Sequence, residues 1–278
     1  MVALNIMLKV AIVNMKGGVG KTMTAIHLAA GLARHGARVL LIDADPQGNI
    51  GHALGVRIGR SIRELMLGES PMSDVIVRGV RERLDIVPST PAAFGLDMQL
   101  AAQPSRETIL ARRLQGLSGY DALVIDCSPA MSLLTYNALL VASDVIVPVG
   151  MDGMAILGAR QTLAGIREIS TLWPDRRLDV MAILPTSVNV AATKATRAAF
   201  EAFDEHADLG SRLYRRGIRQ CIDLMYAVTQ GLTIWEYAPR SRAAEDYDAF
   251  VDFVRGAGDA PSERTADANK IEKRQTVV

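Results

Sequence analysis

The stretch NMKGGVGKTMT, residues 14–24, decides the fold of this chain. It lies between an apolar, β-branched run, residues 8–14, and a helical pattern, residues 24–36. A glycine-rich loop between a strand and a helix points several backbone N–H groups into one concavity, where the helix N-terminus adds a partial positive charge. Such a concavity holds phosphate oxygens, so the stretch predicts a phosphate-binding loop.

The loop departs from the strict GxxxxGK[ST] pattern at its start. The first glycine of that pattern would fall at Met15, and Lys16 follows where the usual loop has only small residues. The later residues fit the pattern: Lys21 is placed against the β- and γ-phosphates, and the hydroxyl of Thr22 is placed to coordinate Mg²⁺. The loop pattern therefore leaves the role of Lys16 open.

Six short β-branched runs alternate with longer helical patterns, an order typical of βαβ units. The runs are almost continuously apolar, which indicates strands covered on both faces. They span residues 8–14, 38–43, 84–89, 122–126, 144–149 and 179–185. The helical patterns span residues 24–36, 156–169 and 192–203. The sequence predicts an α/β fold with a doubly wound, mostly parallel sheet flanked by helices.

Length and composition favour one large domain. The chain has 278 residues and a formal net charge of +1, so its overall charge says nothing about a nucleic-acid partner. We expect residues 1–255 to form a single domain and the polar residues 256–278 to be disordered. The apolar opening lacks the basic start of a signal peptide, and no apolar run reaches the roughly 20 residues of a membrane span.

The two cysteines predict neither a zinc site nor a redox pair. Cys127 and Cys221 are far apart in the sequence, and no His/Cys cluster accompanies them. We expect reduced thiols in a cytosolic protein.

Two acidic segments follow predicted strands. LLIDADPQGN, residues 40–49, places Asp43 and Asp45 at the end of the second run, and YDALVIDCSP, residues 120–129, ends its apolar run at Asp126. Ligands of open α/β sheets collect at the carboxyl ends of the strands. Three aspartates around one phosphate loop therefore predict a metal–nucleotide site.

Taken together, these segments resemble the deviant Walker A, A′ and B boxes of the ParA/MinD family of P-loop ATPases. GLTIWEYAPRSRAAEDY, residues 231–247, is similar to the C-terminal block of Soj-like ParA partition proteins, so the resemblance covers residues 1–255 almost completely. It implies ATP and Mg²⁺ as cofactors, slow and partner-stimulated ATP hydrolysis, and a homodimer that sandwiches ATP.

The resemblance also implies roles for individual residues. Lys16 corresponds to the signature lysine that reaches the nucleotide of the facing subunit, and Asp45 to the carboxylate that positions the attacking water. The implied catalytic residues are Lys16, Lys21 and Asp45, and the implied metal-site residues are Thr22, Asp43 and Asp126. The nucleotide-binding loop comprises Lys16, Gly17, Gly18, Val19, Gly20, Lys21, Thr22 and Met23. A cation supplied across an interface increases phosphoryl-transfer rates by roughly 10³ to 10⁵.

The chain departs from the family pattern near the adenine. Arg215, Arg216 and Gly217 stand where the family has Pro-Arg-Asn, which leaves the adenine contacts open. Met15, Met23 and Ser128 are lesser departures, and we expect the backbone N–H of Met23 still to face phosphate.

A basic segment indicates the branch of the family. SRLYRRGIRQ, residues 211–220, contains four arginines and no acid, and arginines bind DNA phosphates without reading sequence. Arg219 also resembles an arginine that the family uses for non-specific DNA binding. The predicted DNA-binding residues are Lys194, Arg197, Arg215, Arg216, Arg219 and Arg242.

We therefore expect a cytoplasmic, nucleoid-associated ATPase for DNA segregation or cargo positioning. Its ATP-bound dimer would bind double-stranded DNA non-specifically, and a ParB-like or other cargo adaptor would stimulate hydrolysis and release. A regulatory ATP switch without DNA binding is the alternative from another class. A MinD-like membrane ATPase would need a C-terminal amphipathic helix, which the sequence does not show, so we expect no membrane partner.

Overall fold

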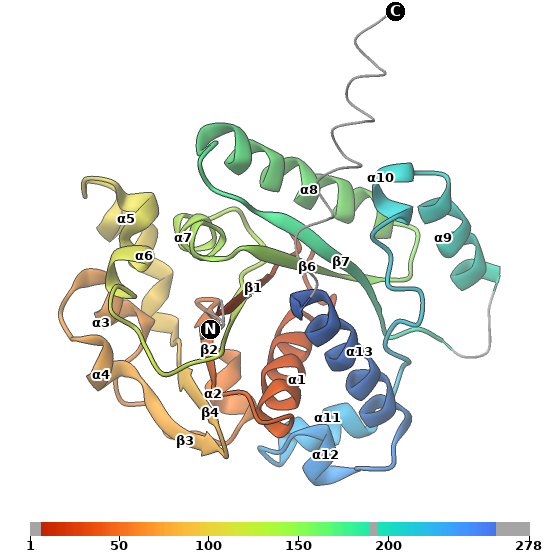
Figure 1. Cartoon of the computed structure of the whole chain (residues 1–278), viewed down its shortest axis with the longest axis horizontal. Coiled ribbons are helices and arrows are strands. Elements are labelled where there is room, and N and C mark those ends of the chain that lie inside the picture. Colours follow the sequence, from red (N-terminus) through yellow and green to blue (C-terminus); the bar gives the residue numbers. More distant parts are fainter. Residues whose placement is uncertain (1–6, 190–193, 260–278) are drawn as a thin grey trace, which may run out of the picture.

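The computed structural model describes residues 7–189 and 194–259, and these build a three-layer α/β structure around one sheet (Figure 1). The sheet has seven strands in the order β3-β4-β2-β5-β1-β6-β7. Neighbours in the sheet are parallel except β3 and β4, which form an antiparallel pair at one edge. The strands are β1 (Leu8–Ile12), β2 (Val39–Ala44), β3 (Val77–Arg81), β4 (Leu84–Val87), β5 (Ala122–Cys127), β6 (Asp144–Gly150) and β7 (Asp179–Thr186).

Helices cover both faces of this sheet. The longer ones are α1 (Lys21–Arg34), α7 (Leu133–Val141), α8 (Ala155–Leu172), α9 (Lys194–Asp204) and α13 (Arg242–Asp259). The shorter ones are α2 (Asn49–Ala53), α3 (Ile62–Leu67), α4 (Met72–Val75), α5 (Leu96–Leu100), α6 (Ile109–Arg113), α10 (Ala207–Gly210), α11 (Asp223–Thr229) and α12 (Ile234–Tyr237). Two 3₁₀ turns, η1 (Pro91–Gly95) and η2 (Arg106–Thr108), precede α5 and α6.

Each face of the sheet has its own apolar core. Along β1, Ala11 and Val13 pack with residues of α3 and α5 to α8, while Val10 and Ile12 pack with α1, α2, α12 and α13. This division follows from the alternation of side chains along a strand. It explains why the central strands β2 and β5 are buried at every residue.

The strand order reverses beside β1. The chain leaves β1 through α1 to reach β2, passing over β5, while β6 occupies the other side of β1. Crevices at such switch points, outside the carboxyl ends of the strands, are where open α/β sheets bind ligands. The loop at residues 13–20 lies at this point, between β1 and α1.

The predicted fold class is confirmed, and each of the six predicted runs forms a strand. Strand β3 was not predicted. Helix α13 continues to Asp259, past the predicted domain end at Arg255, because Ala257 packs against the core. The remaining residues of the predicted tail, 260–278, lie outside the described part of the chain. Within that part, no helix has both the length and the hydropathy to cross a bilayer.

Candidate functional site

The loop between β1 and α1 has the geometry of a phosphate site. Gly18 and Gly20 have φ of 73° and 78°, in the left-handed region that favours glycine. Gly20 is the N-cap of α1; no side chain caps this end of the 14-residue helix, and its first turn holds no acidic residue. The N–H groups here are therefore available to an anion, and the helix dipole favours one.

Lys21, the first residue of α1, lies inside the loop. Its Nζ donates a hydrogen bond to the backbone carbonyl of Lys16 at 3.0 Å, and the residue is buried. Burial lowers the pKa of this amine, and the nearby carboxylates of Asp126 and Asp45 oppose that shift. A partly desolvated cation next to the loop acts strongly on a phosphate because little water screens it.

Asp43 and Asp126 are direct neighbours at the carboxyl ends of β2 and β5. Both are buried. The Asp43 carboxylate accepts hydrogen bonds from the backbone N–H groups of Asp45 and Ile50, both at 3.1 Å. Burial nevertheless raises the pKa of Asp43 to about 7. The two carboxyl groups thus share a site in which ionisation is costly without a cation.

Among the site's carboxylates, Asp126 has the surroundings that best suit a cation. Neither of its carboxylate oxygens has a hydrogen-bond partner among the described residues. Burial raises the pKa of Asp126 well above 3.8, and the charge of Asp43 adds to the shift, whereas the Thr22 hydroxyl beside it lowers the pKa. A hydroxyl and buried carboxylates suit Mg²⁺, which typically binds few protein ligands and completes its shell with water and phosphate oxygens.

No group of three or more His, Cys, Asp or Glu side chains in the described ranges could hold a metal by itself. Mg²⁺ commonly takes one or two protein carboxylates and fills the rest of its shell with water and phosphate oxygens, so the donors around Asp126 fit a cation that arrives together with phosphate.

Asp45 is held in a tight turn after β2. One carboxylate oxygen accepts the N–H of Gln47 at 2.9 Å, and the Asp45 carbonyl accepts the N–H of Gly48 at 3.0 Å. Gly48 has a φ of 68°, and a Cβ there would lie 2.6 Å from the carbonyl oxygen of Ser89, so this turn requires glycine. The turn fixes the Asp45 carboxylate beside Lys21. There its negative charge partly offsets the lowering of the Lys21 pKa by burial. Its predicted role in positioning water stays a prediction.

Lys16 binds an acid that the sequence analysis did not single out. Its Nζ lies 2.6 and 2.8 Å from the two carboxylate oxygens of Asp152, in the turn between β6 and α8. The pair is partly exposed, with 32% of the Lys16 and 55% of the Asp152 side chain accessible. The hydrogen bond from Lys16 lowers the pKa of Asp152. Next to the pair, Met154 and Leu157 are exposed.

Asn14 and Thr162 hold the start of the loop and were also missed. Buried Asn14 donates to the carbonyl of Pro148 at 2.7 Å and accepts the N–H of Lys16 at 2.8 Å. The Thr162 hydroxyl accepts the N–H of Met15 at 3.1 Å. Asn14 at the end of an apolar strand was the one signal for this network that the sequence offered.

A cavity of about 460 Å³ adjoins the phosphate loop at Gly20 and Met23. Its walls come from the end of β7 and from residues 218–229, and include Ile218, Leu224 and Tyr247. An apolar cavity of this size next to a phosphate loop suits a planar base. Arg219 and Cys221 also line it, although neither was predicted to lie near the nucleotide.

Gly217 explains how the unusual Arg215-Arg216-Gly217 segment fits beside this cavity. Its φ is 58°, and a Cβ would lie 2.9 Å from the Val188 side chain and 3.0 Å from the Pro185 carbonyl oxygen. The next residue, Ile218, donates its N–H to that carbonyl at 2.8 Å. Glycine thus lets the segment run along the end of β7, and the cavity wall begins at the next residue, Ile218.

The predicted DNA-binding residues fall into two groups. Arg219 donates to Asp246 at 2.8 Å and to Glu245 at 2.6 Å, and Arg216 lies 3.2 Å from Glu245. The hydrogen bonds that Arg219 donates to these carboxylates, mainly to Asp246 and then to Glu245, raise its pKa. Arg215 similarly pairs with an acid, Asp204 at the end of α9.

The second group, Lys194, Arg197 and Arg242, has no ion pair within the described residues. The absence of acids from the basic segment itself was therefore no guide to its charge in the fold, because α9 and α13 supply them.

Comparisons with known proteins identify the family of this chain. A family model described as an AAA domain matches residues 7–179. The sporulation initiation inhibitor protein Soj of Bacillus subtilis is 34% identical over 242 residues, which cover 86% of this chain and 94% of that protein. The chromosome-partitioning ATPase Soj of Thermus thermophilus is 38% identical, with 88% and 94% covered.

Solved structures give the same picture. A cobyrinic acid a,c-diamide synthase of Mycobacterium smegmatis, solved with ADP and magnesium, superposes with a TM-score of 0.76 at 30% identity, covering 88% of this chain and 93% of that chain. A plasmid partition protein of Borrelia burgdorferi, at 21% identity and a TM-score of 0.75, shares the fold, with 90% and 99% covered. The chain belongs to the ParA/MinD family of P-loop ATPases, among relatives of the Soj and ParA partitioning type.

Proposed function

We propose that this protein is a Mg²⁺-dependent ATPase whose ATP-bound homodimer binds DNA non-specifically and positions a cargo. The observation that carries the proposal is the direction of the Lys16 side chain. Its ammonium group reaches away from the loop that contains it, to the partly exposed Asp152. From that position the Lys16 ammonium could contact the nucleotide of a second subunit, whereas the Lys21 ammonium contacts only its own loop.

Within one subunit, the residues divide the work of phosphoryl transfer. Bound ATP and Mg²⁺ would supply the reacting phosphoryl group and the divalent charge. Lys21 would exchange the Lys16 carbonyl for phosphate oxygens, while Thr22 and Asp126 would hold the cation, with Asp43 beside them. Asp45, fixed by its turn, would orient the attacking water. Such positioning and charge neutralisation account for most phosphoryl-transfer catalysis.

Across the dimer, Lys16 would act on the nucleotide of the facing subunit. The exposed Met154 and Leu157 next to it would be covered in the same step. ATP binding would then favour dimerisation, and hydrolysis would reverse it because the two are linked equilibria. A ParB-like or other cargo adaptor would stimulate hydrolysis and so control the lifetime of the dimer.

DNA binding is proposed for Lys194, Arg197, Arg215, Arg216, Arg219 and Arg242, which would associate the cytoplasmic dimer with the nucleoid. About three phosphate contacts per subunit would give a dimer about six and a log–log salt slope of roughly −5. A monomer would have about half that slope.

A second candidate function is an ATP switch that controls a protein assembly without touching DNA. The pairing of Arg216 and Arg219 with Glu245 and Asp246 favours it, because these acids reduce the positive potential of the basic segment.

Retention on duplex DNA, measured at several salt concentrations with ATP or ADP, separates the two candidates. We expect ATP-dependent, salt-sensitive retention that weakens in a variant combining Lys194→Ala and Arg197→Ala. Arg177→Ala is the matched control, because Arg177 pairs with Asp179 beyond the far end of α8. Absence of ATP-dependent, salt-sensitive retention would favour the switch without DNA. Equal retention of all variants would remove Lys194 and Arg197 from the proposed contact.

A further inference from the structure

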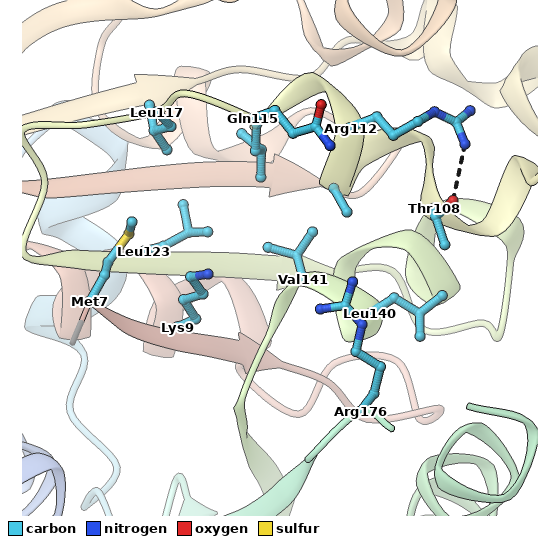
Figure 2. A pocket seen from close by; sticks show the side chains of 12 residues that line it. Met7, Lys9, Thr108, Arg112, Gln115, Leu117, Leu123, Leu140, Val141 and Arg176 are labelled. Carbon is cyan, nitrogen blue, oxygen red and sulfur yellow. Dashed lines mark hydrogen bonds between the residues drawn. The ribbon is translucent and has the colours of Figure 1, made fainter. Parts of the chain in front are cut away.

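A second cavity, of about 530 Å³, lies at the amino-terminal ends of the central strands, whereas the phosphate loop lies at their carboxyl ends. It opens among the amino-terminal ends of β1 and β5, helix α6 and the end of α7 (Figure 2). Leu123 and Leu140, both almost fully buried, are apolar parts of its wall, and Leu114 and Val141 extend that surface. The carboxyl ends of β1 and β5 carry the ATP site, so this cavity belongs to no part of the machinery described above.

Two cations point into this cavity without a partner. Figure 2 shows the Lys9 amine and the Arg176 guanidinium reaching into the same space from β1 and from the segment after α8. Neither side chain makes a hydrogen bond or ion pair with the described residues. Arg112 adds a third positive charge and is fixed in place, since it donates to the Ser105 carbonyl and the Thr108 hydroxyl, each at 3.1 Å.

Among the residues that the structure describes, no carboxylate lines the cavity. Nearby acids are occupied elsewhere: Asp121 pairs with Arg38, and Asp179 with Arg177. Asp144 lies on β6 beside β1, but strand alternation places it on the face of Ile146, which packs into the opposite core. Lys9 is on the other face, with Ala11 and Val13. Within the described residues, the partly buried Lys9 and the exposed Arg176 therefore have no carboxylate partner at the cavity.

We infer that this cavity binds a small organic anion that carries an apolar body. Its volume is within the range of small-molecule sites, roughly 300 to 1,000 Å³. The head group, a phosphate or a carboxylate, would contact Lys9 and Arg176, and the apolar body would pack against the partly buried Leu114 and Val141. Charge-assisted hydrogen bonds to the two cations would hold the head, and burial of the apolar body would supply the remaining affinity.

The test is isothermal titration calorimetry of the full-length chain with n-octyl phosphate and, separately, with n-octanoate. Two further titrations isolate the parts of the ligand: inorganic phosphate lacks the apolar body, and n-octanol lacks the charge. We expect n-octyl phosphate, n-octanoate or both to bind, and each isolated part to bind at least about tenfold more weakly. Preference between the two amphiphiles identifies the head group.

Variants connect that binding to the cavity. The double variant Lys9→Gln, Arg176→Gln should weaken binding at least about tenfold, and Arg177→Gln, which changes the adjacent arginine outside the cavity, should not. Ala111→Phe, which fills the cavity from α6 and alters no charge, should also weaken binding. Each variant should keep its ATP hydrolysis, because the cavity is at the opposite edge of the sheet, and this activity verifies folding.

Absence of binding by both amphiphiles would overturn the inference. Equal affinity of the double variant, or displacement of the amphiphile by ATP, would also overturn it. The inference does not depend on the proposed DNA binding or dimerisation.

Discussion

Lys16 and Asp152 form an ion pair within one subunit, with the Lys16 Nζ 2.6 Å from the carboxylate. The two residues are 136 positions apart, and the fold brings them together because β1 and β6 are neighbours in the sheet. Exposed ion pairs contribute roughly 0 to 1 kcal/mol. Asp152 can therefore hold the Lys16 side chain in the monomer. Lys16 can still leave Asp152 at small energetic cost to contact the nucleotide of the other subunit.

Asp152→Asn should promote ATP-dependent dimerisation. Without the carboxylate, Lys16 is free in the monomer. The dimer dissociation constant should fall by up to about 30-fold, the equivalent of about 1 kcal/mol for each of the two ion pairs that dimerisation breaks. Analytical ultracentrifugation in ATP measures this, with Asp179→Asn as a control that opens another exposed pair. Loss of dimerisation in Asp152→Asn would instead assign the carboxylate to a contact across the interface.

Asp126→Asn should stabilise the nucleotide-free protein at alkaline pH while impairing catalysis. A pKa raised above 3.8 in the folded state means that this carboxyl stabilises the fold when protonated, and that the benefit is lost as pH rises through the folded pKa. Asparagine lacks this titration. Thermal unfolding without Mg²⁺ should show a larger gain at pH 8 than at pH 5.

In the same variant, Mg²⁺-dependent ATP hydrolysis should fall about 10- to 100-fold, as expected for an outer partner of a metal. A variant less stable than the wild type at both pH values would contradict the assignment of Asp126 as a buried carboxylate whose ionisation destabilises the nucleotide-free fold.

His27 should make stability depend on pH in the acidic range. It is buried between Tyr247 and Trp235, its Nε2 accepts the N–H of Ile234 at 3.1 Å, and its Nδ1 therefore donates to the Met23 carbonyl at 2.8 Å. Burial lowers the pKa of His27 from 6.5 to about 4. The unfolded state thus binds the proton first, and His27 loses its stabilising effect as pH falls from 6.5 towards 4.

The expected slope from His27 is at most about 1.4 kcal/mol per pH unit. Asp43 and Asp126 act in the opposite direction, so the measurement is the difference between wild type and His27→Gln in urea unfolding from pH 4 to 7. His52→Gln, at an exposed position, should leave the slope unchanged. A His27→Gln slope equal to that of the wild type would contradict the account.

Glu245→Gln should increase DNA affinity if the basic segment contacts phosphate. Glu245 is exposed and pairs with both Arg216 and Arg219, whereas Asp246 is buried. Removing one counter-charge should steepen the salt slope by up to about one ion per subunit. The control is Asp248→Asn. Asp248 lies on α13, as Glu245 does, and its replacement frees Arg34 and changes the net charge by the same amount. Equal effects of the two variants would mean that only net charge matters.

The sequence predicted the parts of this structure that depend on local pattern. Apolar runs predicted the buried strands because parallel strands covered on both faces need continuous hydrophobicity. β3 was missed because VRGVR, partly exposed at the sheet edge, has arginines and a glycine where a buried strand would be apolar. The polar composition after Arg255 suggested that the domain ends there, but helix α13 continues to Asp259 and Ala257 packs on the core.

The candidate site shows the same limit. Lys21, Thr22 and Asp126 belong to short motifs at strand ends, and topology alone places them together. Asp152 was not predicted because its importance depends on a lysine distant in sequence, and no spacing rule relates the two. The acids opposite Arg216 and Arg219 were missed for the same reason, since α13 supplies them from another segment.

The central claim, that Lys16 serves the nucleotide of the facing subunit, is tested most directly by mixing two inactive variants. Lys16→Ala keeps Asp45 but donates no lysine, while Asp45→Ala donates the lysine but cannot orient water. Each variant alone should hydrolyse ATP poorly. Random mixing should restore about a quarter of wild-type activity, because half of the dimers contain one complete composite site. Activity that stays at the level of the separate variants, although the mixed dimer forms, would show that Lys16 acts in its own subunit and contradict the account.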